Sequence, residues 1–313
     1  MGSVLRAAEI SRDAPSAYEG KPFLKWAGGK WGLAPQIREL LPPDLPLRTY
    51  REPFLGSGAM FFYLARYARP RRAFLSDALG DLITTYQIVT SATEDLIAEL
   101  EALKKKHSTE TFYAVRERFN TERDARPVLR AAWLIYLNKT CFNGLYRTNS
   151  RGEFNVPVGR YTAPAIVDTP RLLAARDALR GATIKHAAFD HLDAEAEPGD
   201  VIYLDPPYVP VSSSANFSAY ADGGFDDADQ ERLRDLFVRL DERGCVLALS
   251  NSDTPRVRDL YRGFEVREIV VARSISAKGQ ARVPAAEVLV RNAPRRTRSA
   301  PRTATRTRAK VNK

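Results

Sequence analysis

A carboxylate, two prolines and an aromatic ring follow one another in Asp205-Pro206-Pro207-Tyr208. The four apolar residues at 201–204 come directly before them and predict a buried strand, which the prolines end. In open α/β sheets ligands bind at the carboxyl ends of the strands, so this motif would form a binding site. An ordinary strand-to-loop turn could have the same residues, and the motif alone leaves both interpretations open.

Two glycine-rich stretches earlier in the chain could also approach a ligand closely. Residues 23–30 read Phe-Leu-Lys-Trp-Ala-Gly-Gly-Lys, so that Lys30 could reach a carboxylate or phosphate. A predicted strand at 50–54 is followed by Leu-Gly-Ser-Gly-Ala and by a helix at 60–67. This order is typical of nucleotide-binding βα units, although a single Gly-x-Gly is weak evidence.

The next predicted strand, 72–76, ends in Asp77. An acidic residue at this strand end accepts hydrogen bonds from a ribose diol in nucleotide-binding folds. Asp77 could instead be the N-cap of a helix at 79–89. Both roles place Asp77 at the same strand end.

The pattern from 92 to 139 is wholly helical, with apolar residues at helical spacing such as Leu96, Leu100 and Leu103. It interrupts the strand–helix alternation and predicts an insertion in the α/β domain. A long loop at 138–161 follows, in which amides, arginines, aromatics and glycines are interleaved. Such side chains suit contact with DNA, because Arg can bind guanine, Asn can bind adenine and rings can stack. A surface loop without function is the alternative.

Strand–helix alternation then resumes. The pattern predicts strands at 182–186, 200–204 and 245–250, and a final pair at 264–271 and 286–291 that could form an antiparallel edge. Asp226 is the predicted cap of a helix that runs to Leu240. The segment 209–225 is too long for a simple turn and is expected to be a mobile loop at the cleft.

The net charge of +10 is concentrated at one end. Eight basic residues and no acid lie in 294–313, which leaves +2 for the rest of the chain. This tail has no apolar periodicity, so we expect it to be disordered and to favour a polyanion such as nucleic acid.

Two distant cysteines, Cys141 and Cys245, and three histidines match no metal-ligand spacing, so we expect no metal and reduced thiols. No apolar stretch is long enough to span a membrane, and residues 1–20 lack the apolar core of a secretory signal. We therefore expect a cytoplasmic protein, and nothing in the sequence suggests an obligate protein partner.

Five separated motifs together resemble the Dam type of DNA adenine-N6 methyltransferase (D12 class, alpha group). They follow the order of that family and lie at 23–30, 52–59, 76–77, 138–157 and 205–208. The resemblance implies a Rossmann-like α/β methyltransferase sheet with an inserted helical target-recognition domain, S-adenosylmethionine as methyl donor, double-stranded DNA as substrate, and a bacterial or phage enzyme acting at the nucleoid. Four segments follow: a leader at 1–20, a catalytic domain at 21–91 and 168–292, the inserted domain at 92–167, and the tail at 293–313.

The resemblance also implies roles for single residues. Asp205, Pro206 and Tyr208 would hold the target base. The donor would be bound by Trp26, Lys30, Phe54, Gly56, Gly58, Asp77, Phe189 and Asp205. The recognition positions would be Phe142, Asn143, Leu145, Arg147 and Pro157, and the commonest target among such sequences is GATC. Residues 139–141 depart from the enterobacterial members.

Three other substrates would permit the same chemistry: cytosine N4, RNA adenine and a protein glutamine. Asp rather than Asn before the two prolines, together with the large basic loop, favours DNA. A different class of function is a non-catalytic DNA-binding protein on a methyltransferase scaffold. The presence of every donor-site and catalytic residue disfavours it.

Overall fold

The structure is a computed structural model, and it describes residues 20–26, 28–41, 47–209, 225–271 and 285–292. The predicted leader, the predicted loop at 209–225 and the predicted basic tail lie wholly or mostly outside the described residues. No helix in the described part of the chain is long and apolar enough to cross a membrane.

Seven strands form one sheet in the order β3-β2-β1-β4-β5-β7-β6. All neighbours are parallel except at one edge, where β7 runs antiparallel to both β5 and β6. This confirms the predicted antiparallel pair at the end of the chain. The strands are β1 (Thr49–Glu52), β2 (Arg72–Asp77), β3 (Thr183–His186), β4 (Val201–Leu204), β5 (Val246–Ser252), β6 (Glu265–Val271) and β7 (Ala285–Arg291).

Helices cover both faces of the sheet, and the strands alternate between two apolar cores. Tyr203 of β4 packs in the core shared with α1, α2 and α3, whereas Ile202 and Leu204 pack in the core shared with α8, α10 and α11. The helices are α1 (Ala34–Leu40), α2 (Ala59–Tyr67), α3 (Gly80–Ser91), α4 (Thr93–Lys105), α5 (Thr109–Thr121), α6 (Pro127–Thr140), α7 (Thr169–Leu179), α8 (Leu192–Glu195), α10 (Asp227–Arg243) and α11 (Pro255–Leu260).

The sequence predicted the start of α10 correctly, but it did not predict the N-cap of α3. Asp226 accepts a hydrogen bond from the backbone N–H of Asp229, whose side chain accepts one from the Asp226 N–H, so the predicted cap is a full capping box. Leu79 is the N-cap residue of α3, not Asp77.

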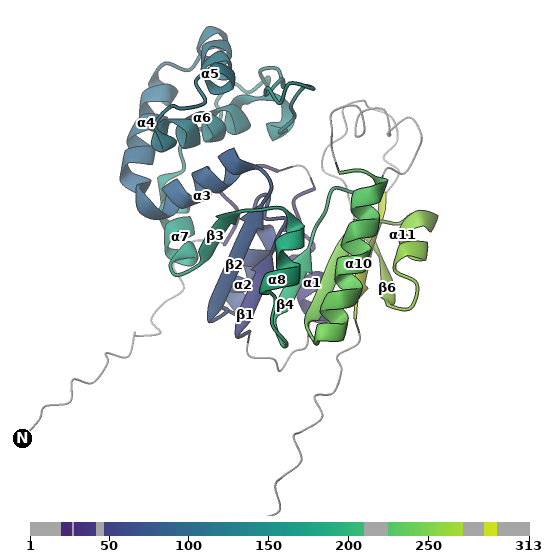
Figure 1. Cartoon of the computed structure of the whole chain (residues 1–313). Helices are drawn as coiled ribbons and strands as arrows, with labels where there is room; N and C mark the ends of the chain where they lie inside the picture. Colours follow the sequence, from purple (N-terminus) through teal and green to yellow (C-terminus); the bar gives the residue numbers. More distant parts are fainter. Residues whose placement is uncertain (1–19, 27, 42–46, 210–224, 272–284, 293–313) are drawn as a thin grey trace, which may run out of the picture.

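Helices α4, α5 and α6 gather beyond α3, away from the body of the sheet (Figure 1). The long helix α6 is buried along most of its length, and it contacts α3, α4 and α5. The interpretation of 92–167 as a target-recognition domain remains a prediction.

The chain changes direction between β1 and β4. From β1 it continues outward to β2 and β3, whereas from β4 it continues the other way to β5. The carboxyl ends of two neighbouring strands whose connections diverge leave a crevice, which is where open α/β sheets bind ligands. The motifs that follow β1 and β4 therefore meet at this crevice.

Candidate active site

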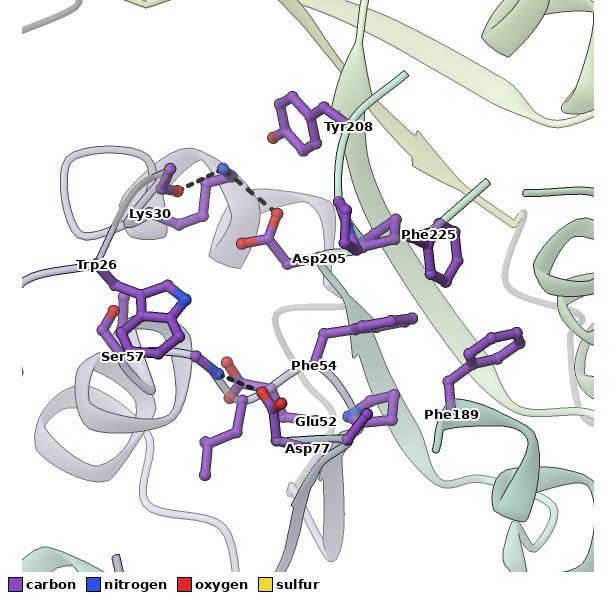
Figure 2. Close-up of a pocket in the computed structure, with 18 of the residues that line it drawn as sticks. Trp26, Lys30, Glu52, Phe54, Ser57, Asp77, Phe189, Asp205, Tyr208 and Phe225 are labelled. Carbon is purple, nitrogen blue, oxygen red and sulfur yellow. Dashed lines mark hydrogen bonds and ion pairs between the residues drawn. The ribbon is translucent and has the colours of Figure 1, made fainter. Parts of the chain in front are cut away.

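A cavity of about 840 Å³ lies at the carboxyl ends of β1, β2 and β4. Its walls come from segments that are far apart in the sequence (Figure 2). Nearly all of the residues predicted to bind the donor or the base line it: Trp26, Lys30, Phe54, Gly56, Asp77, Phe189, Asp205, Pro206 and Tyr208.

Gly58 is the exception, since it does not line the cavity. It is the N-cap of α2, with a φ of 67°, and a Cβ there would lie 3.0 Å from the hydroxyl of Tyr86. Gly56 has a φ of 47°, and its Cβ would lie 3.0 Å from the indole of Trp26. Both positions require glycine, because the backbone is left-handed and the space for a side chain is already filled.

The two oxygens of Asp77 bind the backbone on both sides of the cavity floor. Oδ2 accepts from the N–H of Gly56 at 2.9 Å, and Oδ1 accepts from the N–H of Leu79 at 2.9 Å. Burial raises the pKa of Asp77, and these two hydrogen bonds oppose that rise. Each carboxylate oxygen has a second lone pair and can accept a further bond from a ligand hydroxyl.

Lys30 and Asp205 point toward one another in the cavity lining and form an ion pair (Figure 2). The Lys30 side chain is 4% exposed, and its ammonium lies 3.3 Å from Asp205 Oδ1 and donates to the carbonyl of Gly28 at 2.5 Å. Ser250 donates to the same oxygen of Asp205 at 3.1 Å. Burial raises the pKa of Asp205, whereas the charge of Lys30 lowers it and favours the ionised carboxylate.

The hydroxyl of Tyr208 is held by Glu287, a residue that no sequence motif singled out. Its hydroxyl donates to Glu287 Oε2 at 2.7 Å, and the Lys30 ammonium lies 4.4 Å from the centre of its ring. Glu287 belongs to β7 and also lies 3.9 Å from Lys30. The only hint in the sequence is a single acid in the otherwise apolar stretch before Arg291.

Glu52 is a second acid whose part in the site was not predicted, although it belongs to one of the motifs. It ends β1, lines the cavity and is 2% exposed. Its Oε2 accepts from the Tyr50 hydroxyl at 2.8 Å and from the Phe61 N–H at 3.0 Å. Burial raises the pKa of Glu52 to about 8.

Aromatic rings form another wall. The rings of Phe54 and Phe189 are stacked with centroids 5.5 Å apart, and Phe225 meets Phe54 edge-on at 5.7 Å. The guanidinium of Arg232 lies 5.3 Å from the Phe189 ring, at the rim. Flat apolar walls of this kind suit a planar ring such as a purine.

The predicted recognition residues lie outside the cavity, on a hairpin-like loop closed by bridges between Cys141 and Val158 and between Thr148 and Phe154. Phe154 and Val156 are buried and anchor it, and the side chain of Asn120 bonds both backbone groups of Phe154. Phe142, Arg147 and Pro157 are exposed, whereas Asn143 and Leu145 are half-buried.

Tyr146 connects this loop to the cavity. It lines the cavity and stacks on Trp26, with ring centroids 5.7 Å apart and 18° between the planes. Asn138 strengthens the connection, because its side chain bonds both backbone groups of Lys25 and the carbonyl of Gly144. Tyr146 was not among the predicted site residues, although it lies between two predicted recognition positions.

The profile of the D12 class N6 adenine-specific DNA methyltransferases matches residues 26–275. The chain belongs to this family. It is 40% identical over 276 residues to the type II methyltransferase M.MjaIII of Methanocaldococcus jannaschii, a match that covers 84% of this chain and 96% of that protein. It is 38% identical to the DNA adenine methylase of Serratia marcescens, over 82% and 93% of the two chains, and 36% identical to that of Escherichia coli, over 87% and 95%.

Family membership confirms the predicted enzyme class and the Rossmann-like methyltransferase fold. The protein is an adenine-specific DNA methyltransferase that depends on S-adenosylmethionine. Among the residues that the structure describes, no group of three or more His, Cys, Asp or Glu side chains is arranged to hold a metal ion.

Proposed function

We propose that this methyltransferase binds S-adenosylmethionine in the cavity at the ends of β1, β2 and β4, and transfers its methyl group to N6 of an adenine flipped out of duplex DNA. The observation that carries this proposal is the convergence of Lys30, Asp205 and Tyr208 on one cavity, beside the turn held by Asp77.

The residues present fit the donor. The glycine turn leaves bare backbone beneath the cavity, where a Cβ at Gly56 would meet Trp26, and Asp77 keeps acceptor capacity for a ribose hydroxyl. Trp26 and Lys30 would flank the methionine end, Phe54 and the Gly56–Gly58 turn would support it from below, and Phe189 would flank the adenine. Acidic side chains outnumber basic ones in the lining, which favours a positively charged sulfonium compound.

When bound, the donor supplies an electrophilic methyl group on a sulfonium. The protein's task is to activate a poor nucleophile, because the lone pair of adenine N6 is delocalised into the ring. The carboxylate of Asp205 and the carbonyl of Pro206 would accept the two N6 hydrogens, which favours a pyramidal nitrogen with its lone pair directed at the methyl group. Direct transfer needs correct placement of two reactants and no covalent enzyme intermediate, and the proton that N6 loses on methylation would pass to the Asp205 carboxylate or to water.

Adenine in a duplex cannot reach this cavity, so the base must leave the helix. The ring of Tyr208 would stack on it, a contact worth roughly 1–3 kcal/mol. Recognition of the surrounding sequence falls to the hairpin. Arg147 uses only its Nε in the described part of the chain, donating to Asn155 at 2.7 Å, so its terminal nitrogens can bind guanine.

We propose GATC as the target and the bacterial or phage nucleoid as the place of action. The similar proteins are named both as type II methyltransferases and as DNA adenine methylases. These names support either a restriction–modification partner or a solitary methylase.

Labelled S-adenosylmethionine and two unmethylated duplexes that differ only in one GATC site test the proposal. We expect label in adenine N6 of the GATC duplex alone, and none with Asp205→Ala. Label at adenine in both duplexes would refute GATC but keep the enzyme. Label in cytosine of either duplex, or in an RNA assayed alongside them, with none in DNA adenine, would refute the proposed substrate.

A further inference from the structure

The backbone on both sides of Tyr208 is hydrogen-bonded to a network of buried side chains that do not line the cavity. Its hydroxyl bonds Glu287, but a ring can only be placed as accurately as the backbone that carries it. The residue before it, Pro207, is hydrogen-bonded to a side chain of α10, and the residue after it, Val209, is hydrogen-bonded to side chains of β5.

Gln230 of α10 holds the residue before Tyr208. Its Nε2 donates to the carbonyl of Pro207 at 2.8 Å, and its Oε1 accepts from Asn251 Nδ2 at 3.2 Å. Asn251 holds the residue after it, since its Oδ1 accepts from the N–H of Val209 at 3.1 Å.

Both amides are deeply buried, at 2% exposed for Gln230 and 0% for Asn251. Ser252 completes the network by donating to the carbonyl of Val209 at 2.6 Å. A buried amide is costly unless its hydrogen-bonding groups are satisfied, and here these bonds are made largely to the loop that carries the catalytic motif. By contrast, the carbonyl of Pro206 accepts no hydrogen bond from the described residues, so it can accept one from a base.

We propose that Gln230 and Asn251 are positioning residues, which fix the backbone on both sides of Tyr208 and leave the Pro206 carbonyl directed at the target amine. This inference rests on the function proposed above. Removal of the Gln230 bond would let the Pro207 carbonyl and the Tyr208 ring shift, and small displacements of reacting groups reduce rates by about a hundredfold. Donor binding would change little, because neither amide lines the cavity.

Two substitutions of Gln230 separate positioning from general damage. Gln230→Glu and Gln230→Met keep the size of the side chain but remove the amide donor to Pro207. Asn292→Asp is the matched control: Asn292 is also buried, and it bonds Leu247, Cys245 and the Asp241 carboxylate at the end of β5 away from the motif.

The measurement is single-turnover methyl transfer to adenine at saturating S-adenosylmethionine and GATC duplex, together with the donor dissociation constant. We expect both Gln230 variants to transfer about tenfold to a hundredfold more slowly at pH 8.5, with donor binding within about twofold of wild type. Asn292→Asp is expected to keep the wild-type rate at temperatures where it is folded.

A pH profile gives a second, independent readout. In Gln230→Glu the introduced carboxyl can again donate to Pro207 once it is protonated, so its rate relative to wild type should recover as the pH falls to about 6. Gln230→Met should show no recovery.

The inference is overturned if both Gln230 variants transfer at the wild-type rate, if they lose donor binding in proportion to the rate, or if Asn292→Asp is equally slow. If Gln230→Glu fails to fold, Gln230→Met still gives the decisive rate. A wild-type enzyme that methylates no DNA adenine would refute the proposed function instead, and this outcome is seen before any variant is compared.

Discussion

The cavity and the hairpin-like loop closed by the Cys141–Val158 bridge differ in how many contacts their side chains make with the rest of the chain. In the cavity, Lys30 and Asp205 bond to each other and to other parts of the chain. On the hairpin, the side chains of Phe142 and Arg147 are exposed, and the side chain of Arg147 makes a single hydrogen bond within the described residues.

The difference separates two kinds of function. Preorganised groups reduce the cost of reaching the transition state and act on every substrate equally. Exposed side chains on a framework anchored by Phe154 and Val156 are free to contact DNA, which is the role proposed for them above. Changes in the cavity should therefore alter the rate on all DNA, whereas changes on the hairpin should alter the choice among sequences.

Asp205→Ala tests the cavity side of this contrast most strongly. The substitution removes the acceptor proposed for one of the two N6 hydrogens, so methyl transfer should fall by about a hundredfold to a thousandfold or more on every duplex. Single-turnover transfer measures the loss, and circular dichroism checks that the variant unfolds cooperatively. Asp205→Asn keeps an acceptor oxygen and should lose less; substantial activity in the alanine variant would remove Asp205 from the mechanism.

Burial of an acidic side chain in the cavity should also lower the stability of the fold when that side chain ionises, and Glu52 provides the test. Its pKa is raised from 4.5 to about 8, so between these values the folded state holds a proton that the unfolded state has lost. The contribution of Glu52 to the free energy of unfolding therefore falls as the pH rises from about 4.5 to 8, and levels off above 8.

Glu52→Gln is neutral at every pH and should not show this fall. Its free energy of unfolding relative to wild type should rise between pH 5 and pH 8 by on the order of a few kcal/mol, measured by urea denaturation without donor. The exposed Glu122 gives a control, since its pKa is lowered by Arg118 and Glu122→Gln should show no such gain. An equal pH dependence in wild type and Glu52→Gln would contradict the assignment.

Arg147→Ala tests the hairpin side. Loss of one bidentate contact to guanine should cost roughly 1–3 kcal/mol and relax the preference for the target site over a duplex with one changed base pair. Arg151, which is 77% exposed and paired with Glu153 in the same hairpin, is the matched control. An equal loss on both duplexes would identify Arg147 as a phosphate contact, because phosphates carry no sequence information.

How much the sequence could predict follows the same division. The strand ends at Glu52, Asp77 and Asp205 were predictable, because apolar runs and the turns after them are local signals. The register that brings β7 beside β5 is not local. Glu287 was therefore missed, and so was Gln230, which lies on an amphipathic helix like any other polar residue.

The burial of Glu52 could not be predicted either, because acidic side chains are ordinarily exposed. In the structure all four residues of β1, Glu52 included, are buried. The expectation for Asp77 was closer. Its side chain accepts a hydrogen bond from the N–H of Leu79, next to the first residue of α3. It also accepts one from the N–H of Gly56. Asp77 thus contacts the N-cap residue of α3 without being the N-cap itself, and its role toward a ribose stays a prediction.

Tyr146 belongs to both regions, and its contact with Trp26 tests how separate they are. Double-mutant cycles with Trp26→Ala and Tyr146→Ala should give a coupling free energy of about 0.5–1.5 kcal/mol, the value expected of a stacked aromatic pair. If the contact only stabilises the fold, the coupling will be present in urea denaturation and absent from the ratio of transfer rates on GATC and altered duplexes. If the contact transmits recognition, that ratio will also be coupled, because the loop that reads the sequence would then set the position of a cavity wall. Coupling in neither measurement would show that the two regions work independently despite their contact.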